Sequence, residues 1–302
     1  MTKEYQLKLD RMLVPVDLTA IDANLIRYAG AMAKLLKPHQ VTFYHAIPTY
    51  ELDSKSQMLL QSGTNTIDRV IRQKITETVQ NYFDYQCHWE VVTTTSEDGV
   101  AENILQFIRE EDVELTLIGQ KSGYERAEQT GQKLAAEAPC DILYVPDLAP
   151  VELDKIMCAI DFSDAARRAF RRALELAKTT QAELFNYFVA DSSRAYFPAT
   201  TDRSQQKYQQ QSEQRQRDFL QEFALSPEEI QCLSELPDTH QGQAAQIYQA
   251  ALDYGAKLII IGSEGQTKKQ TSLLGNLSES FRLLNKRLAV MVVQAAEVDK
   301  SL

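Results

Sequence analysis

The stretch Arg11-Met-Leu-Val-Pro-Val-Asp17 returns later in the chain as Lys155-Ile-Met-Cys-Ala-Ile-Asp161, with its final aspartate 144 residues further on. Both stretches are short apolar runs that end in an aspartate. Such near-continuous runs are typical of strands buried on both faces of a parallel sheet. The sequence therefore predicts two copies of the same opening strand.

Two further landmarks repeat at almost the same distance. The run Glu114–Gly119 corresponds to Lys257–Gly262, and Gly99 corresponds to Gly242, with 143 residues between the members of each pair. Spacings that agree to within one residue over such a length indicate an internal duplication. We expect two domains of the same fold.

The two domains are expected at residues 1–147 and 151–297, with a proline-bracketed linker at Pro146–Pro150. In the first domain the predicted strands are 9–17, 41–47, 86–93, 114–119 and 141–146, and the predicted helices are 19–36, 62–80, 100–111 and 129–137. In the second domain the predicted strands are 155–161, 182–190, 229–235, 257–262 and 288–293, and the predicted helices are 163–179, 203–224, 243–254 and 275–285. This alternation predicts an α/β fold in which each domain has a doubly wound parallel sheet and a ligand crevice at the carboxyl ends of its strands.

Polar side chains mark the start of the helix that follows each opening strand. Thr19, with Asp22 three residues later, and Ser163 can accept hydrogen bonds from the N–H groups that a first helical turn leaves without partners. We expect Thr19 and Ser163 to be the N-caps of these two helices.

The composition of the 302-residue chain limits its partners. Hydrophobic residues make up 44% and charged residues 25%, which is typical of a globular protein. The net charge of −10 repels the phosphates of nucleic acids and of anionic membranes, and no apolar run approaches the roughly 20 residues that span a bilayer. Four widely spaced cysteines and the lack of a signal-peptide pattern favour a cytoplasmic location. We expect no nucleic-acid or membrane partner.

A glycine-rich loop follows the fourth strand of the second domain. It reads Gly262-Ser-Glu-Gly265 and, after nine further residues, Gly275-Asn-Leu-Ser278. Glycines let a backbone approach a phosphate closely, and successive N–H groups can form an anion-binding nest. The helix expected from Gly275 directs the positive end of its dipole to the same place. The alternative is that Gly262 only ends a strand and Gly275 only starts a helix.

The spacing Gly-x2-Gly-x9-Gly, together with Asp161-Phe-Ser163 and the Ala-rich helix Ala165–Lys178, resembles the universal stress protein family in its tandem two-domain form. The resemblance extends over essentially the whole chain. It implies two five-stranded sheets of the adenine nucleotide α-hydrolase-like fold, with strand order 3-2-1-4-5. It also implies bound ATP or another adenine nucleotide, with Mg²⁺ on the phosphates as a lesser option.

The resemblance also gives roles to residues at the crevice. Ala159, Ile160 and Asp161 would line the nucleoside, with Asp161 accepting hydrogen bonds from ribose hydroxyls, and the backbone of Phe188 would read the edge of the adenine. The phosphates would lie against Gly262, Gly265, Gly275, Asn276, Leu277 and Ser278. The alternatives are that Asp161 is a capping or turn carboxylate and that Phe188 only packs in the core.

The first domain has an incomplete version of the loop. Gly119 is followed by Gln-Lys-Ser122 where the second glycine is expected, and the closing position falls on Gly131 or, counted back from the last strand, on Glu128. A phosphate there would meet an incomplete nest of N–H groups. We predict a nucleotide in the C-terminal domain only.

No arrangement of residues predicts catalysis or a metal site. The chain has no HExxH, no Walker loop and no Gly-x-Ser-x-Gly elbow, and His45 is expected to be a hydrogen-bonded strand-end histidine. The leading hypothesis is a nucleotide-binding stress or signalling protein, whose site is compatible with slow ATP hydrolysis but does not predict it. The alternative is a scaffold or small-molecule sensor of the same fold. It is favoured by the acidic Glu264 in the loop and by Asn276, where the family usually has Ser or Thr.

Two other arrangements complete the expectations. An AMP-forming ligase of a related fold ranks last, since its pyrophosphate loop is absent after the first strand. The resemblance implies an internal dimer of the two domains, in which residues 141–146 pair with residues 288–293 across a pseudo-twofold axis. The sequence leaves a further homodimer open.

Overall fold

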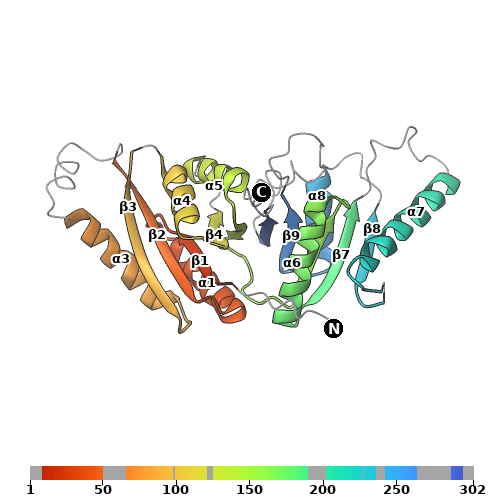
Figure 1. The fold of residues 1–302 in the computed structure, drawn as a ribbon, viewed down its shortest axis with the longest axis horizontal. Helices are drawn as coiled ribbons and strands as arrows, with labels where there is room; N and C mark the ends of the chain where they lie inside the picture. Colours follow the sequence, from red (N-terminus) through yellow and green to blue (C-terminus); the bar gives the residue numbers. More distant parts are fainter. Residues whose placement is uncertain are drawn as a thin grey trace, which may run out of the picture. The chain divides into compact units, whose positions relative to one another are not determined.

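The computed structural model describes residues 9–49, 66–97, 99–120, 125–189, 202–226, 228–235, 242–263 and 287–294. These residues form two compact units, which divide between Glu152 and Leu153. In each unit, helices pack against a parallel sheet (Figure 1). None of the described helices is both long enough and apolar enough to cross a membrane.

The N-terminal unit alternates strands and helices along the chain. Its strands are β1 (Arg11–Pro15), β2 (Gln40–Pro48), β3 (His88–Ser96), β4 (Leu115–Gln120) and β5 (Asp141–Pro146), and its helices are α1 (Asp22–Leu36), α3 (Thr66–Tyr82), α4 (Val100–Glu110) and α5 (Glu125–Glu137). Neighbouring strands are parallel and lie in the order β3-β2-β1-β4-β5. The predicted doubly wound fold and its strand order 3-2-1-4-5 are confirmed.

The C-terminal unit repeats this arrangement. Its strands are β6 (Lys155–Ile160), β7 (Glu183–Val189), β8 (Gln231–Glu235), β9 (Leu258–Gly262) and β10 (Ala289–Val293), and its described helices are α6 (Asp164–Thr180), α7 (Asp202–Gln221) and α8 (Gln243–Asp253). The strands lie in the order β8-β7-β6-β9-β10 and are parallel. The helix predicted at 275–285 lies outside the described residues.

The core lies on both faces of each sheet, as the apolar runs predicted. Every residue of β9 and β10 is buried. In β2, Phe43 packs against Phe83 with 5.3 Å between ring centroids, whereas the next residue, Tyr44, packs against Phe107 of α4 at 4.9 Å. Alternate side chains of one strand thus meet helical layers on opposite faces of the sheet.

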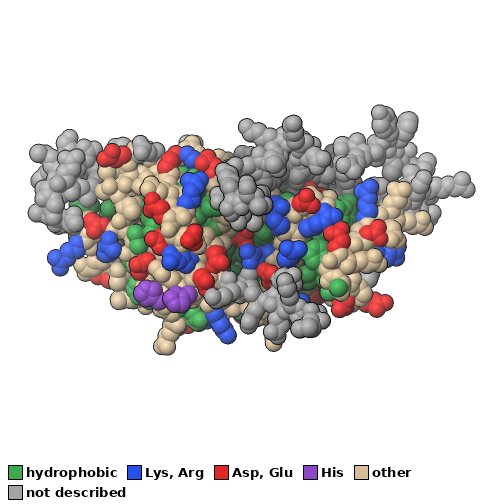
Figure 2. All heavy atoms as spheres, viewed as in Figure 1, with side chains coloured by type: hydrophobic (Ala, Val, Ile, Leu, Met, Phe, Trp, Pro, Cys, Tyr) green, Lys and Arg blue, Asp and Glu red, His purple; other side chains and the backbone are tan. Residues whose placement is uncertain are grey.

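Acidic and basic side chains are interspersed over the face shown in Figure 2. The described residues form ion pairs such as Lys34 with Asp84 at 2.6 Å and Lys155 with Glu183 at 3.4 Å. Exposed pairs of this kind contribute little to stability individually. Neither sign of charge gathers into one large patch on the described part of this face.

The strand register matches the two units residue by residue. Pro15 pairs with Tyr44 in the N-terminal unit, and Ala159 pairs with Tyr187 in the C-terminal unit. Because Ala159 follows Pro15 by 144 residues, the offset between the opening strands, the partners of the two residues also correspond. The matched pairs in the second strands are Phe43 with Asn186, Tyr44 with Tyr187, and His45 with Phe188.

Asn186 is a polar residue in the core of the C-terminal unit. It is 1% exposed, and neither its amide oxygen nor its amide nitrogen has a hydrogen-bond partner among the residues that the structure describes. Its counterpart Phe43 is fully buried and packs against aromatic rings. A buried polar group without a partner costs free energy of folding, because water solvates it in the unfolded chain.

Replacement of Asn186 by valine is expected to stabilise the C-terminal unit, because it removes two unpartnered polar atoms and suits a β-strand. We expect the free energy of unfolding to rise by about 1–2 kcal/mol, measured by chemical denaturation. Thr116→Val is the control: Thr116 is also fully buried, but its hydroxyl lies 3.3 Å from the Cys140 thiol, so this change should not stabilise. A lower stability of Asn186→Val than of the wild type would contradict the prediction.

Candidate functional site

The candidate site lies at the carboxyl ends of β6, β7 and β9. Ala159 and Ile160, at the end of β6, are 1% and 2% exposed, and Asp161 follows them. Ile160 pairs in register with Phe188 of β7, which is 5% exposed. On its other side, β6 pairs with β9, which ends at Gly262. The structure thus brings together the four residues expected to line a nucleoside and the first residue of the expected phosphate loop.

Asp161 and Ser163 form the turn between β6 and α6. The Ser163 N–H donates to Oδ1 of Asp161 at 3.0 Å, and the Ala166 N–H donates to Oγ of Ser163 at 3.1 Å. Ser163 is therefore the N-cap of α6, as predicted. Asp161 makes the contact of a turn carboxylate.

The corner after the opening strand has a left-handed backbone in both units. Phe162 has φ = 64° and Leu18, 144 residues earlier, has φ = 66°. Bulky residues rarely adopt a positive φ, because Cβ approaches the following carbonyl oxygen. Interactions with the surroundings must therefore hold each corner in place.

In the N-terminal unit a carboxylate holds this corner. The side chain of Asp22, 6% exposed, accepts hydrogen bonds from the N–H groups of Leu18 at 2.7 Å and of Asp17 and Thr19 at 3.2 Å. The prediction that Thr19 caps this helix is wrong: α1 begins at Asp22, and the Thr19 hydroxyl donates to Asp17. Ala166 stands 144 residues after Asp22, so the C-terminal unit has no carboxylate at this position.

Gly262 has a packing role. A Cβ at this position would lie 2.4 Å from the carbonyl oxygen of Ala165 in the first turn of α6. The next residue, Ser263, donates its N–H to the Val293 carbonyl at 2.9 Å and its hydroxyl to Gln294 at 2.6 Å. β9 ends at Gly262, as the alternative to a phosphate-binding role proposed, and close packing against α6 by itself requires a glycine here. The role of Ser263 was not predicted, because the expected loop contacts rested on the spacing of the glycines.

The remaining loop residues lie outside the described residues. These are Gly265, Gly275, Asn276, Leu277 and Ser278, together with Glu264. Their expected contacts with phosphates stay predictions.

In the N-terminal unit the closing positions of the loop lie inside a helix. α5 begins at Glu125, four residues before the predicted start, so both Glu128 and Gly131 are helical. The predicted helix 129–137 began too late, because the stretch Glu125–Gln129 consists of good helix formers. The Gly131 carbonyl accepts a hydrogen bond from the Tyr144 hydroxyl at 2.8 Å, which fixes the helix to β5. Only residues 121–124 remain for a loop.

The strand register shows how many residues connect equivalent positions of the last two strands in each unit. Gly119 pairs with Val145, 26 residues later, whereas its counterpart Gly262 pairs with Val293, 31 residues later. The connection in the C-terminal unit is therefore five residues longer between equivalent points of the two sheets. This extra length follows the strand where the sequence predicts the phosphate loop.

His45 occupies, in the N-terminal unit, the position of Phe188. It is buried, and its Nδ1–H donates to the Val16 carbonyl at 2.7 Å. Burial lowers the pKa of His45, opposed by that hydrogen bond and by the charge of Asp17. The predicted hydrogen bond of this histidine is confirmed, but its position is not: β2 continues to Pro48, so His45 lies within the strand and not at its end. Within the described ranges, no three His, Cys, Asp or Glu side chains gather as a metal site.

A family model supports the relationship that the loop and the duplicated corner suggest. The model of the universal stress protein family matches residues 8–146 and again residues 152–283. The chain belongs to the universal stress protein family. The two matches coincide with the two halves of the duplication, so this universal stress protein is a tandem one. None of the curated proteins compared with it matches.

A solved structure shows the same fold, and others match one half of the chain. A universal stress protein from Archaeoglobus fulgidus DSM 4304 matches with a TM-score of 0.64 at 17% identity, over 97% of this chain and 98% of the other. Universal stress protein UspA from Lactobacillus plantarum has a TM-score of 0.35 at 14% identity, over 46% of this chain and 98% of its own. An Archaeoglobus fulgidus universal stress protein in complex with dAMP has a TM-score of 0.32 at 15% identity, over 46% and 98%. The first of these matches over nearly the whole length of both chains.

Replacement of Gly262 by alanine is expected to destabilise the protein by roughly 1–3 kcal/mol, because the new methyl group would meet the Ala165 backbone. The duplication supplies the control. At the equivalent Gly119 a Cβ would have its nearest neighbour, a Leu25 methyl carbon, at 3.5 Å, so Gly119→Ala should change stability by less than about 0.5 kcal/mol. Chemical denaturation of both variants checks this, and similar losses at the two positions would refute it.

The lowered pKa of His45 predicts a loss of stability in mild acid. Because His45 takes up a proton near pH 6.5 in the unfolded chain but only at lower pH in the folded one, its contribution is complete above about pH 6.5 and is lost as the pH falls through the folded pKa. In His45→Phe, the free energy of unfolding should fall less between about pH 7.5 and about pH 5 than in the wild type. An equal fall in the wild type and in His45→Phe would contradict the prediction.

Proposed function

We propose that this universal stress protein binds an adenine nucleotide, ATP, in the crevice of its C-terminal unit. The observation that carries the proposal is the connection after Gly262, which is five residues longer than its counterpart after Gly119. This connection contains the pattern Gly-x2-Gly-x9-Gly, whose N–H groups and helix start suit a triphosphate. Mg²⁺ would accompany the phosphates.

The described end of the crevice suits the nucleoside. Asp161 carries a carboxylate at the end of the central strand β6, where it can accept hydrogen bonds from two ribose hydroxyls. Ala159 and Ile160 offer buried apolar surface beside it, and the backbone of the neighbouring Phe188 can bond the edge of the adenine.

The N-terminal unit is proposed to bind no nucleotide. Its corner N–H groups at Leu18 and Thr19 already bond the Asp22 carboxylate, so they are not available to a ligand. Only residues 121–124 separate β4 from α5, too few to surround a triphosphate. The role of this unit is then support for its partner domain.

The output of the protein is proposed to be a change of conformation or partner on binding, in a stress or signalling role, without catalysis. A cytoplasmic location, the pairing of residues 141–146 with 288–293 and any further self-association stay predictions. A scaffold or small-molecule sensor is the second candidate, because Glu264 places a negative charge in the loop that is expected to surround phosphates.

Calorimetric titration with ATP and Mg²⁺ tests the proposal. We expect one site per chain in the wild type, no binding by Gly265→Val, whose side chain would fill the phosphate approach, and wild-type binding by Ser122→Val in the other unit. Equal effects of the two substitutions would refute a site in the C-terminal unit alone.

Mass spectrometry of ligand released from freshly purified protein separates the two candidates. ATP or AMP at about one per chain supports the nucleotide site. A different small molecule, combined with no heat on titration with ATP, would support the sensor.

A further inference from the structure

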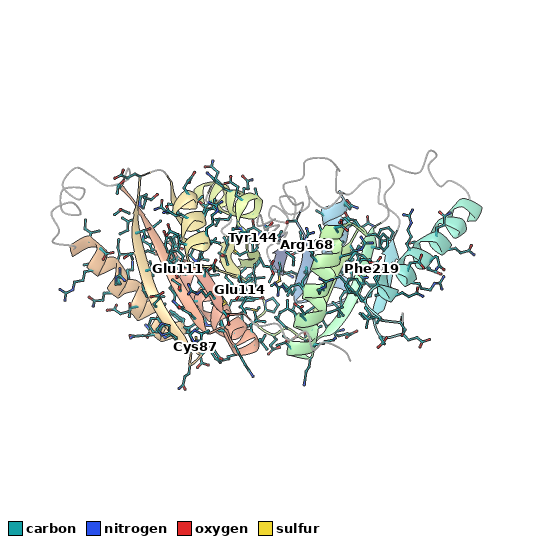
Figure 3. All side chains as sticks on the ribbon, viewed as in Figure 1. Cys87, Glu111, Glu114, Tyr144, Arg168 and Phe219 are labelled. Carbon is teal, nitrogen blue, oxygen red and sulfur yellow. The ribbon has the colours of Figure 1, made fainter. Side chains whose placement is uncertain are left out.

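The left-handed corner at Phe162 is anchored by its own ring. The ring packs against Phe188 at 4.5 Å and against Phe219 of α7 at 5.7 Å between centroids. Phe219 is 2% exposed and lies on the side of α7 that faces the sheet (Figure 3). Ring packing fixes the side chain of Phe162 but does not by itself fix the direction of its peptide group.

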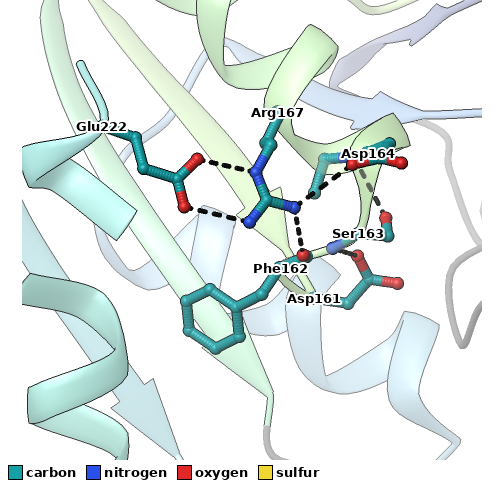
Figure 4. Close-up of polar contacts among 7 residues, drawn as sticks. Asp161, Phe162, Ser163, Asp164, Arg167 and Glu222 are labelled. Atoms are coloured by element: carbon teal, nitrogen blue, oxygen red, sulfur yellow. Dashed lines mark hydrogen bonds and ion pairs between the residues drawn. The ribbon is translucent and has the colours of Figure 1, made fainter. Parts of the chain in front are cut away.

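Arg167 fixes that peptide group. Its Nη1 donates to the Phe162 carbonyl at 2.6 Å, and Nη1 also lies 3.5 Å from Oδ1 of Asp164 (Figure 4). Two other nitrogens of the same guanidinium bond the carboxylate of Glu222, Nε to Oε2 at 2.7 Å and Nη2 to Oε1 at 2.9 Å. Such two-point pairing orients a guanidinium far better than a single contact does.

The pair is charged and oriented in the folded protein. Hydrogen bonding to Arg167 lowers the pKa of Glu222, and the same contact raises the pKa of Arg167. The guanidinium also lies 5.9 Å above the ring of Phe219, the ring that packs against Phe162. One arginine thus contacts the carbonyl of the corner, the end of α7 and the aromatic cluster between them.

The N-terminal unit holds its corner from the opposite side. There the Asp22 carboxylate accepts a hydrogen bond from the N–H of Leu18, whereas in the C-terminal unit Arg167 donates one to the carbonyl of Phe162. Ala23 stands 144 residues before Arg167, so the arginine belongs to the C-terminal unit alone. The corner next to Asp161 therefore has no counterpart of Asp22, and its Ser163 N–H bonds the Asp161 carboxylate itself.

We propose that Arg167 and Glu222 are positioning residues for the nucleotide: they hold the Phe162 peptide so that the Asp161 carboxylate faces the ribose hydroxyls. The inference rests on the proposed function, because it requires ATP in this crevice. It adds two residues that contact no ligand themselves. Their effect on binding passes through Asp161, one residue before the fixed peptide group.

The test compares ATP with 2′,3′-dideoxy-ATP, which lacks the hydroxyls that Asp161 would bond. In Arg167→Met, which keeps the apolar stem and removes the guanidinium, we expect the Kd for ATP to rise roughly tenfold and the Kd for the dideoxy analogue to stay unchanged. Glu222→Gln, a milder change, should shift the Kd for ATP in the same direction by less. Arg172→Met on the same helix, which breaks the ion pair with Glu175 at 3.3 Å and leaves the Phe162 carbonyl contact of Arg167 in place, is the control and should bind both nucleotides as the wild type does.

The outcomes separate the two proposals. If the wild type binds ATP but Arg167→Met loses affinity equally for ATP and for the dideoxy analogue, the positioning role is overturned and only a structural role remains. An unchanged Kd for ATP in folded Arg167→Met and Glu222→Gln, checked by circular dichroism, would also overturn it. A wild-type protein that does not bind ATP would overturn the proposed function, and this inference with it.

Discussion

The opening strand of each unit ends in a corner that the chain passes in a left-handed conformation, at Leu18 or at Phe162. This conformation is unfavourable for a bulky residue, so each corner needs a partner to hold it. The N-terminal unit uses a buried carboxylate on the N–H side, and the C-terminal unit uses a guanidinium on the carbonyl side. The choice decides which backbone groups of each corner are already bonded: the N–H groups of Leu18 and Thr19 in the first unit, and the Phe162 carbonyl in the second.

Other matched positions have diverged in the same way, within an unchanged fold. Phe43 and Asn186 occupy equivalent points of the second strand, as do His45 and Phe188. In the C-terminal unit the aromatic packing is found instead between α6 and α7, where Phe170 contacts Phe219 at 5.2 Å between centroids. The strand register survives these exchanges, since it depends on backbone hydrogen bonds and on the alternation of side chains.

The sequence predicted those features that depend on local pattern. The apolar runs located the strands, the repeat located the two units, and Ser163 was recognised as an N-cap. It did not predict the role of Asp22. A threonine followed three residues later by an acid predicts a capping threonine, but here the acid itself accepts hydrogen bonds from three preceding N–H groups. Arg167 and Glu222 lie 55 residues apart, and no periodicity links them. Of the candidate site, the structure brings Asp161 and Phe188 to the carboxyl ends of neighbouring strands, and their contacts with a nucleoside stay predictions.

The duplication within one chain has a consequence for inheritance. In an assembly of identical single-domain subunits, one codon change alters every crevice at once, and a substitution that closes one closes all. Here Asp22 and Ala166 are encoded separately, although they occupy equivalent positions. One crevice can be sealed while the other keeps its ligand, so a fused gene permits a division of labour that a symmetric oligomer forbids.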